Sequence, residues 1–252
     1  MSEHPAGEPT FTEDLLLGGR IRLKQPAAGY RVAIDPVFLA AALPAEPHQL
    51  VLDVGCGAGA AMLCLAARVP HSRLVGLEMQ RDLVRLAGDN IILNGLEARA
   101  SVMIGDLLHP PPRLSPGAFD HVMANPPFHR RGHGEPAVAS GKSAATIEGD
   151  ADLADWVRFS LAMVRSKGTV TFIHRADRID ALLGQIAGRA GEVVIFPLWP
   201  GPEKAASRIL VRARKQVAAP ARLAPGLVLH DADGRLSTDA EGVLREGRRL
   251  DL

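Results

Sequence analysis

The sequence predicts an α/β protein built on a doubly wound, mostly parallel sheet of seven strands. Three observations carry this prediction. From residue 50 onward, short apolar runs typical of buried strands alternate with segments whose apolar residues recur at helical spacing. The first run, 50–54, leads directly into a turn with glycine at every second position: Gly55, Gly57 and Gly59. A helical pattern begins at Ala60, so strand, glycine turn and helix form one βα unit suited to binding a nucleotide.

The remaining elements of the alternating region follow the same pattern. The seven strands are expected at residues 50–54, 73–77, 100–104, 119–124, 169–174, 192–196 and 208–213. Further helices are expected at 82–94, from about 151 to a stop at Gly168, and at 179–190. The long connection 198–207 between the last two strands predicts an antiparallel pair at one edge of the sheet.

The two ends of the chain differ from this region. Before it we expect a flexible acidic tail over 1–14, a hairpin strand at 20–24, and a helix from Asp35 to Leu43 with Asp35 as its N-cap and Pro36 in its first turn. After it we expect a short strand at 226–230 and a helix from about Thr238. A single domain is predicted over 15–252, with an N-terminal segment 15–44, a core at about 45–215 and a C-terminal extension 220–252.

Composition limits the classes of protein that the chain can represent. Of its 252 residues, 47% are apolar, so a full core can form, and a net charge of +1 gives no global field that would point to nucleic acid. In one helix Cys56 and Cys64 would lie ~12 Å apart, too far for a disulfide. There is no zinc-ligand spacing, signal-peptide pattern or apolar run of about 18 residues. We therefore expect a cytoplasmic protein with neither a metal nor a membrane partner.

Acidic residues at strand ends narrow the choice of nucleotide ligand. Glu78 ends the second strand, 19 residues after Gly59, where a carboxylate can accept hydrogen bonds from both ribose hydroxyls. That position suits NAD, FAD and S-adenosylmethionine alike. Two further acids favour S-adenosylmethionine: Asp53 lies inside the first strand, where it suits a ligand with an ammonium and a sulfonium, and Asp106 ends the third strand, where it can accept from an adenine amino group. The nicotinamide fingerprint G-x-G-x-x-G is not present in this turn.

With these residues the sequence resembles the class I S-adenosylmethionine-dependent methyltransferases over roughly residues 50–215. The resemblance implies a Rossmann-like methyltransferase fold and S-adenosylmethionine as the cofactor. It places the cofactor on Asp53, Gly55, Gly57, Gly59, Glu78, Met79, Asp106, Leu107 and Asn125.

The motif Asn125-Pro126-Pro127-Phe128 at the end of the fourth strand indicates the acceptor. A planar amino or amide nitrogen is a poor nucleophile because its lone pair is delocalised. The Asn125 side-chain oxygen and a neighbouring backbone carbonyl can each accept one N–H and direct the lone pair toward the methyl group. The prolines fix φ and remove competing donors, and Phe128 offers a face on which a base can stack. The motif therefore predicts transfer to an amino nitrogen that depends mainly on positioning.

The motif is similar to the signature of methyltransferases that act on adenine N6, guanine N2 or glutamine N5. Residues in the N-terminal segment narrow the resemblance to the bacterial tRNA adenine-N6 methyltransferases that modify the adenine 3′ of the anticodon in a valine tRNA; the C-terminal residues 229–241 also resemble that family. In such enzymes the N-terminal segment covers the cofactor pocket, which implies that Tyr30, Arg31 and Asp35 lie near the ligand. Three basic runs are then expected to contact tRNA: 20–31, 129–142 and 203–222.

Other functions stay open from the sequence. The acceptor could be guanine N2, a DNA adenine or a protein glutamine. Glutamine enzymes carry a longer helical N-terminal domain, for which the roughly 45 residues here leave no room, and related guanine-N2 enzymes often carry a duplicated domain. A nicotinamide oxidoreductase is a different enzyme class, and an RNA-binding protein with this fold but without turnover is a non-enzyme alternative. A polar, glycine-rich segment, 129–150, is expected to be a mobile loop.

Overall fold

The computed structural model describes residues 11–27, 32–127 and 151–252. Its strands are β1 (Phe11–Leu16), β2 (Ile21–Pro26), β3 (Leu50–Val54), β4 (Arg73–Glu78), β5 (Ala100–Ile104), β6 (Phe119–Ala124), β7 (Val164–Arg175), β8 (Ala190–Trp199), β9 (Arg208–Lys215), β10 (Arg222–Leu223) and β11 (Leu227–Val228). Its α-helices are α1 (Asp35–Ala42), α2 (Ala60–Arg68), α3 (Arg81–Leu93), α5 (Leu153–Met163), α6 (Ile179–Ile186) and α7 (Thr238–Leu244).

The central sheet confirms the predicted α/β class. Its strands lie in the order β10-β8-β9-β7-β6-β3-β4-β5, and β11 also pairs with β8. The pairs within β5-β4-β3-β6-β7 are all parallel, whereas β9 runs antiparallel to both β7 and β8. The expected antiparallel pair is therefore present. Because β10 and β11 each add a two-residue strand beside β8, the sheet contains nine strands within the described residues, rather than the predicted seven.

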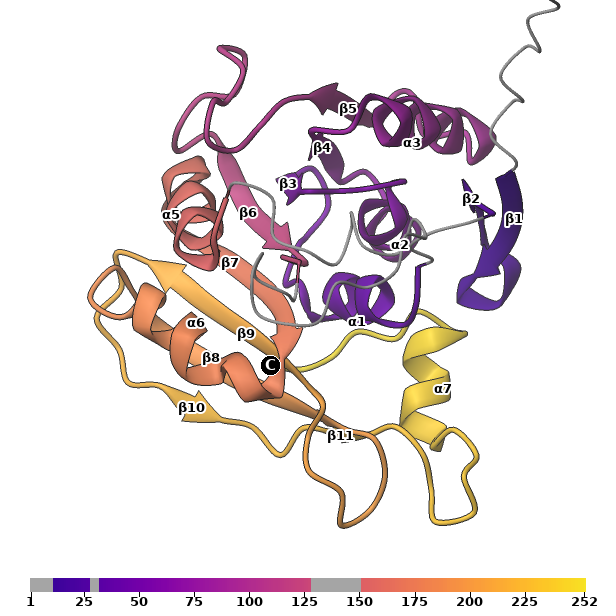
Figure 1. Ribbon diagram of the computed structural model, residues 1–252, viewed down its shortest axis with the longest axis vertical. Coiled ribbons are helices and arrows are strands. Elements are labelled where there is room, and N and C mark those ends of the chain that lie inside the picture. The colour runs from indigo at the N-terminus through magenta and orange to yellow at the C-terminus, as the bar shows by residue number, and fades with distance from the viewer. Residues whose placement is uncertain (1–10, 28–31, 128–150) are drawn as a thin grey trace, which may run out of the picture.

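Helices cover both faces of the sheet (Figure 1). One apolar cluster joins α1, α2 and α3 to one face, and a second joins α5 and α6 to the other. The chain leaves β3 toward β4 on one side and later returns to β6 on the other. In such sheets ligands bind at the carboxyl ends of the strands beside this change of direction. The site should therefore lie where β3, β4, β5 and β6 end.

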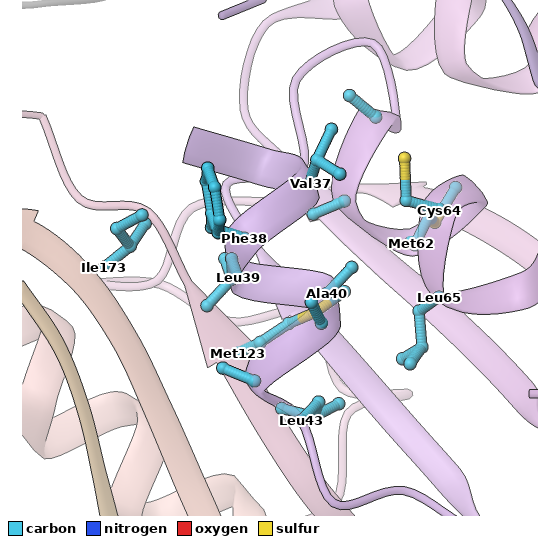
Figure 2. Close-up of a cluster of buried hydrophobic side chains, with 14 of the residues drawn as sticks. Val37, Phe38, Leu39, Ala40, Leu43, Met62, Cys64, Leu65, Met123 and Ile173 are labelled. Carbon is cyan, nitrogen blue, oxygen red and sulfur yellow. The ribbon is translucent and has the colours of Figure 1, made fainter. Parts of the chain in front are cut away.

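Helix α1 lies in the larger of the two clusters. All eight of its residues are buried, as expected of a helix that is apolar on every side. Figure 2 shows Phe38 and Leu39 of α1 among the buried side chains of the same cluster, with Met62 of α2 and Met123 of β6. The Arg68 guanidinium ends the helix by donating to the carbonyl oxygens of Ala40 and Leu43, at 3.0 and 2.6 Å, and its burial lowers the pKa of Arg68 to about 10.

Several boundaries differ from the predicted ones. Helix α5 ends at Met163 rather than at Gly168, because β7 already begins at Val164, opposite Phe119. A Cβ atom at residue 168 would lie 2.5 Å from the Asp120 carbonyl oxygen, so this glycine permits close strand contact and does not stop a helix. Helix α6 ends at Ile186 rather than 190, and β8 already begins at Ala190.

The N-terminal part also differs in detail from the prediction. Strand β1 begins at Phe11, so residues 11–14 pair with β2 instead of belonging to a tail. Asp35 is the first helical residue of α1 and Ile34 takes the N-cap position. The Asp35 carboxylate is buried and accepts a hydrogen bond from Arg208 Nε at 3.0 Å, which ties α1 to β9. Within the described ranges, no helix is long and apolar enough to cross a bilayer.

Candidate functional site

The glycine turn between β3 and α2 has a backbone that only glycine adopts easily. Gly55, Gly57 and Gly59 have φ values of 67°, 56° and 91°, all in the left-handed region. The N–H groups of Gly55 and Cys56 both donate to the Leu77 carbonyl oxygen, at 2.8 and 3.1 Å. The turn is thereby fixed against the end of β4.

The first two glycines of this turn have different surroundings. A Cβ atom on Gly55 would lie 2.4 Å from the indole ring of Trp156, whereas a Cβ on Gly57 would meet no atom of the described residues within 4 Å. The indole therefore lies directly on the turn at Gly55, and the backbone is open at Gly57. The sequence pattern alone gave Trp156 no role in the site. Its rarity was the available signal, because the chain has two tryptophans and only 4% aromatic residues.

Glu78, at the end of β4, is held by backbone hydrogen bonds. Its Oε2 accepts from Gly57 N–H at 3.0 Å and its Oε1 accepts from Gln80 N–H at 2.9 Å. The residue is 6% exposed, while the adjacent Met79 is 60% exposed. Each carboxylate oxygen has a second lone pair, so the fixed carboxylate keeps capacity to accept from a ligand hydroxyl.

Asp106 follows β5 at the same edge of the sheet. Its Oδ1 accepts from Leu108 N–H at 2.9 Å, and His109 Nδ1 lies 3.4 Å from its Oδ2. The Asp106 side chain is 36% exposed. Leu107 packs against the apolar cluster beneath α5 and α6. Gly105 N–H donates to the Glu78 carbonyl oxygen at 2.9 Å, so the ends of β4 and β5 are joined.

Asp53 is buried inside β3 with an incomplete set of partners. The residue is 3% exposed, and its Oδ2 has no hydrogen-bond partner among the residues that the structure describes. Burial raises the pKa of Asp53 to about 8; the Met62 N–H opposes this shift and the Glu78 charge adds to it. The Asp53 carboxyl group is therefore mostly protonated at pH 7, and a nearby cation would favour its ionised form.

Asn125 follows the last residue of β6. Its Oδ1 is buried and accepts no hydrogen bond from any part of the chain that the structure describes. Pro126 and Pro127 follow, and neither has an N–H that could donate to it. The end of β6 lies beside the end of β3, since Ala124 pairs with Val54. The open acceptor is therefore on the strand next to the glycine turn.

Comparisons with known proteins identify this part of the chain. Its residues 31–143 match the family model described as the methyltransferase small domain. This segment, rather less than half of the chain, is thus similar to methyltransferase small domains. It contains the glycine turn together with Asp53, Glu78, Asp106 and Asn125. The resemblance to S-adenosylmethionine-dependent methyltransferases is thus confirmed, whereas Trp156 lies beyond the matched segment.

Curated proteins similar to this chain differ in the acceptors that their names give. The release factor glutamine methyltransferase of Geobacter sulfurreducens is 32% identical over 126 residues, which are 48% of this chain and 43% of that protein. The tRNA1(Val) (adenine(37)-N6)-methyltransferase of Yersinia pestis is 29% identical over 128 residues, which are 48% of this chain and 51% of that protein. The match thus spans about half the length of these curated relatives.

Solved structures agree on the fold of most of the chain. A predicted O-methyltransferase from Agrobacterium tumefaciens has a TM-score of 0.71 at 23% identity, with 86% of this chain and 98% of that chain covered. A geranyl diphosphate methyltransferase in complex with S-adenosylmethionine has a TM-score of 0.51 at 14% identity, covering 71% of this chain and 84% of that one. The fold is that of S-adenosylmethionine-dependent methyltransferases, which agrees with the predicted cofactor.

Some predicted site residues lie outside the described ranges. Tyr30, Arg31 and Phe128 are among them, as is the basic run 129–142. Asp35, predicted near the cofactor, is described and forms the ion pair with Arg208. Among the described residues, no group of three or more histidine, cysteine, aspartate or glutamate side chains is arranged to hold a metal ion.

The basic run 203–222, predicted to contact tRNA, is largely occupied by contacts within the protein. Three of its arginines and Lys215 donate to carboxylates or carbonyl oxygens of other elements: Arg208 to Asp35, Arg212 to the Leu252 carbonyl, Arg214 to Glu192 and Lys215 to the Val164 carbonyl. In the run 20–31, Arg22 pairs with Glu13 at 2.7 Å. These side chains join elements of the fold, which sequence charge alone does not reveal.

Proposed function

We propose that this chain transfers the methyl group of S-adenosylmethionine to a planar amino nitrogen, with adenine N6 in tRNA as the favoured acceptor. The observation that carries the proposal is the buried, unpartnered Oδ1 of Asn125 at the end of β6. A buried acceptor without a donor destabilises the protein unless a ligand supplies that donor. An exocyclic amino group has N–H donors of the required kind.

The residues near the glycine turn fit the predicted cofactor. The open backbone at Gly57 leaves room for a ligand against the turn, and the fixed Glu78 carboxylate is suited to accept from ribose hydroxyls. The unpartnered Oδ2 of Asp53 suits a cationic group, and Asp106 suits an adenine amino group. Met79 and Leu107, beside these acids, would contact the base. When bound, the cofactor supplies an electrophilic methyl group on a sulfonium.

The Asn125 motif would orient the acceptor. Asn125 Oδ1 accepts one N–H of the acceptor amino group, and a carbonyl of the rigid proline segment accepts the other. Holding both protons directs the nitrogen lone pair out of the plane of the base, so the nitrogen becomes more nucleophilic. No general base is required within the site, because the amino proton becomes acidic once the new N–C bond forms and then passes to solvent. The rate therefore depends on positioning.

Two acceptor classes have specific support. The motif Asn125-Pro126-Pro127-Phe128 and the resemblance of the N-terminal segment to tRNA adenine-N6 methyltransferases favour adenine, and the Yersinia relative has that activity in its name. Glutamine N5 of a protein is the second candidate, because the Geobacter relative is a release factor glutamine methyltransferase with slightly higher identity. Both acceptors present the planar NH₂ group that Asn125 would bind.

In vitro methylation can separate the two candidates. The purified chain is incubated with methyl-labelled S-adenosylmethionine and either unmodified bacterial tRNA or an unmodified release factor, and the products are digested and identified by mass spectrometry. We expect label in N6-methyladenosine from tRNA. Label in N5-methylglutamine instead would transfer the proposal to the protein acceptor. No label in either product, with cofactor binding intact, would contradict both.

A further inference from the structure

Asn90 of α3 connects two parts of the molecule that are distant in sequence. Its side chain is fully buried, with 0% exposure. Its Oδ1 accepts from Lys24 N–H at 2.8 Å, and its Nδ2 donates to the carbonyl oxygens of Lys24, at 2.8 Å, and of Ala58, at 2.9 Å. One amide group therefore binds both the hairpin strand β2 and the glycine turn.

Asn94, one helical turn later, binds the hairpin strand β2 but not the glycine turn. Its Oδ1 accepts from Arg22 N–H at 2.9 Å and its Nδ2 donates to the Arg22 carbonyl oxygen at 2.7 Å. Residues four apart lie on the same face of a helix, and residues two apart present their backbone groups on the same edge of a strand. The two asparagines thus pair with the edge of β2 as a neighbouring strand would, but only Asn90 reaches Ala58.

The carbonyl that Asn90 binds is in the middle of the proposed cofactor site. Ala58 lies between Gly57, whose N–H donates to Glu78, and Gly59, whose N–H donates to the Cys56 carbonyl oxygen at 2.9 Å. Fixing the Ala58 carbonyl orients the peptide plane between the last two left-handed glycines. Without Asn90, this buried carbonyl would lose the donor that holds it, and the turn would gain freedom that ligand binding must remove.

The hairpin carries the connection further along the chain. Gln25 of β2 is 3% exposed; its Oε1 accepts from Val32 N–H at 2.8 Å and its Nε2 donates to the Asp14 carboxylate at 2.5 Å. Val32 lies within the N-terminal segment 15–44, which is expected to cover the cofactor pocket. A continuous set of hydrogen bonds therefore runs from the glycine turn through Asn90 and β2 to the chain that leads into α1.

We infer that Asn90 is a positioning residue of the cofactor site, and that through it cofactor binding in the glycine turn and ordering of the β1–β2 hairpin stabilise one another. The inference rests on the proposed function, because it takes the turn to be where S-adenosylmethionine binds. Such coupling is reciprocal: whatever the hairpin contributes to cofactor affinity, the cofactor contributes to hairpin stability. Asn94 provides a matched control, since it binds the same strand in the same way without touching the turn.

The test compares Asn90→Ala with Asn94→Ala. Calorimetric titration with S-adenosylhomocysteine should show an affinity about 10-fold to 100-fold lower for Asn90→Ala, the usual effect of losing a buried hydrogen bond, and little change for Asn94→Ala. Steady-state methylation should show the same difference in the cofactor KM, with kcat much less affected. A role confined to general stability would instead lower the melting temperature of both variants and leave both affinities unchanged.

Hydrogen exchange gives a second measurement, whose main result comes from the wild type alone. In the wild type, S-adenosylhomocysteine should slow exchange of amides in residues 11–26, and Asn90→Ala should remove this effect while Asn94→Ala retains it. If the wild type binds the ligand without any change in hairpin exchange, or if Asn90→Ala binds as tightly as the wild type, the inference is wrong and the proposed function stands. If the wild type does not bind the ligand, the cofactor assignment itself fails. Should Asn90→Ala not fold, the wild-type exchange result decides.

Discussion

Two side chains at the ends of the strands that flank β3, Glu78 on β4 and Asn125 after β6, have opposite hydrogen-bonding states. Both oxygens of Glu78 already accept from backbone N–H groups, whereas Asn125 Oδ1 is buried and accepts from none of the described residues. Asp53, on the strand between them, has one buried oxygen without a partner. In the free protein the Glu78 carboxylate is therefore already held by hydrogen bonds, whereas the Asn125 side-chain oxygen has none from the described residues.

This contrast corresponds to two different roles, binding a ligand and acting on the reacting atom. A group that binds a constant part of a ligand, such as a ribose, benefits from being fixed in advance, because less freedom is lost on binding. A group that acts on the reacting atom is most useful when its hydrogen bond forms only with the acceptor and strengthens in the transition state. An unpartnered buried oxygen costs stability in the free protein, so its presence marks a place where a ligand donor is expected.

The largest effect should come from removing the open acceptor. Asn125→Ala should lower kcat for methyl transfer by roughly 10²–10³-fold, as loss of one preorganised polar group does in other active sites. The affinity for S-adenosylhomocysteine and the melting temperature should change little, since Asn125 Oδ1 has no partner to lose. Calorimetry and thermal unfolding serve as controls; a parallel loss of cofactor affinity would show that Asn125 acts on the cofactor instead.

Replacing the fixed carboxylate should affect binding before turnover. Glu78→Ala should weaken S-adenosylhomocysteine binding by about 1–3 kcal/mol, or about 10-fold to 100-fold, because the ribose loses its acceptor and Gly57 N–H loses its partner. Calorimetric titration measures the change. At saturating cofactor, kcat should recover most of its wild-type value. Unchanged affinity would exclude Glu78 from the ribose site, and tight binding of NADH by the wild type would overturn the cofactor class.

Asp53, which has one buried oxygen without a partner among the described residues, should make the stability of the protein depend on pH. Burial raises its folded-state pKa to about 8 from an ordinary value of 3.8, so between these pH values the folded protein keeps a proton that the unfolded chain releases. Stability should therefore fall as pH rises through this window, by up to about 1.4 kcal/mol per pH unit from this group. Asp53→Asn should remove that part of the slope. Urea unfolding of both proteins at pH 5 to 8 measures it; parallel slopes would contradict the assignment.

The smallest effect should come from the middle glycine of the turn, Gly57. Gly57→Ala places a Cβ in the left-handed region, which costs about 1 kcal/mol of stability, but the new atom meets no atom of the described residues within 4 Å. Gly55→Ala should cost more, because its Cβ would lie 2.4 Å from the Trp156 ring. Chemical denaturation compares the two variants. Equal losses would mean that the indole does not restrict the turn at Gly55.

The sheet was largely predictable because burial on both faces leaves a direct pattern in sequence. The strands 100–104 and 119–124 were predicted with their observed bounds, and Ala60 was correctly expected to begin a helix. Errors arose where a glycine that was taken as a helix stop is required for another structural reason. Residue 168, within β7, is a glycine because the Asp120 carbonyl oxygen leaves no space for a side chain there. No local sequence pattern encodes such a contact.

The residues of the site also fall into those that the sequence could predict and those that it could not. The glycine turn, Glu78, Asp106 and Asn125 follow strand ends, so their shared edge of the sheet could be predicted from strand order. Trp156 and Asn90 could not, because each reaches the turn from a helix across a tertiary contact. The internal contacts of the basic run 203–222 could not be predicted for a related reason: its arginines on β9 have partners in other elements, such as Asp35 of α1 for Arg208 and Glu192 of β8 for Arg214.

The most direct test of the account compares two substitutions of nearly equal size at Asn125. Asn125→Asp keeps an oxygen that can accept an amino proton, whereas Asn125→Leu keeps the volume but removes the acceptor. Single-turnover methylation of unmodified tRNA, at saturating labelled cofactor, should retain measurable transfer in Asn125→Asp and be lowered by roughly 10²–10³-fold in Asn125→Leu. Equal rates for the two variants would contradict the central claim that the Asn125 oxygen orients the acceptor nitrogen.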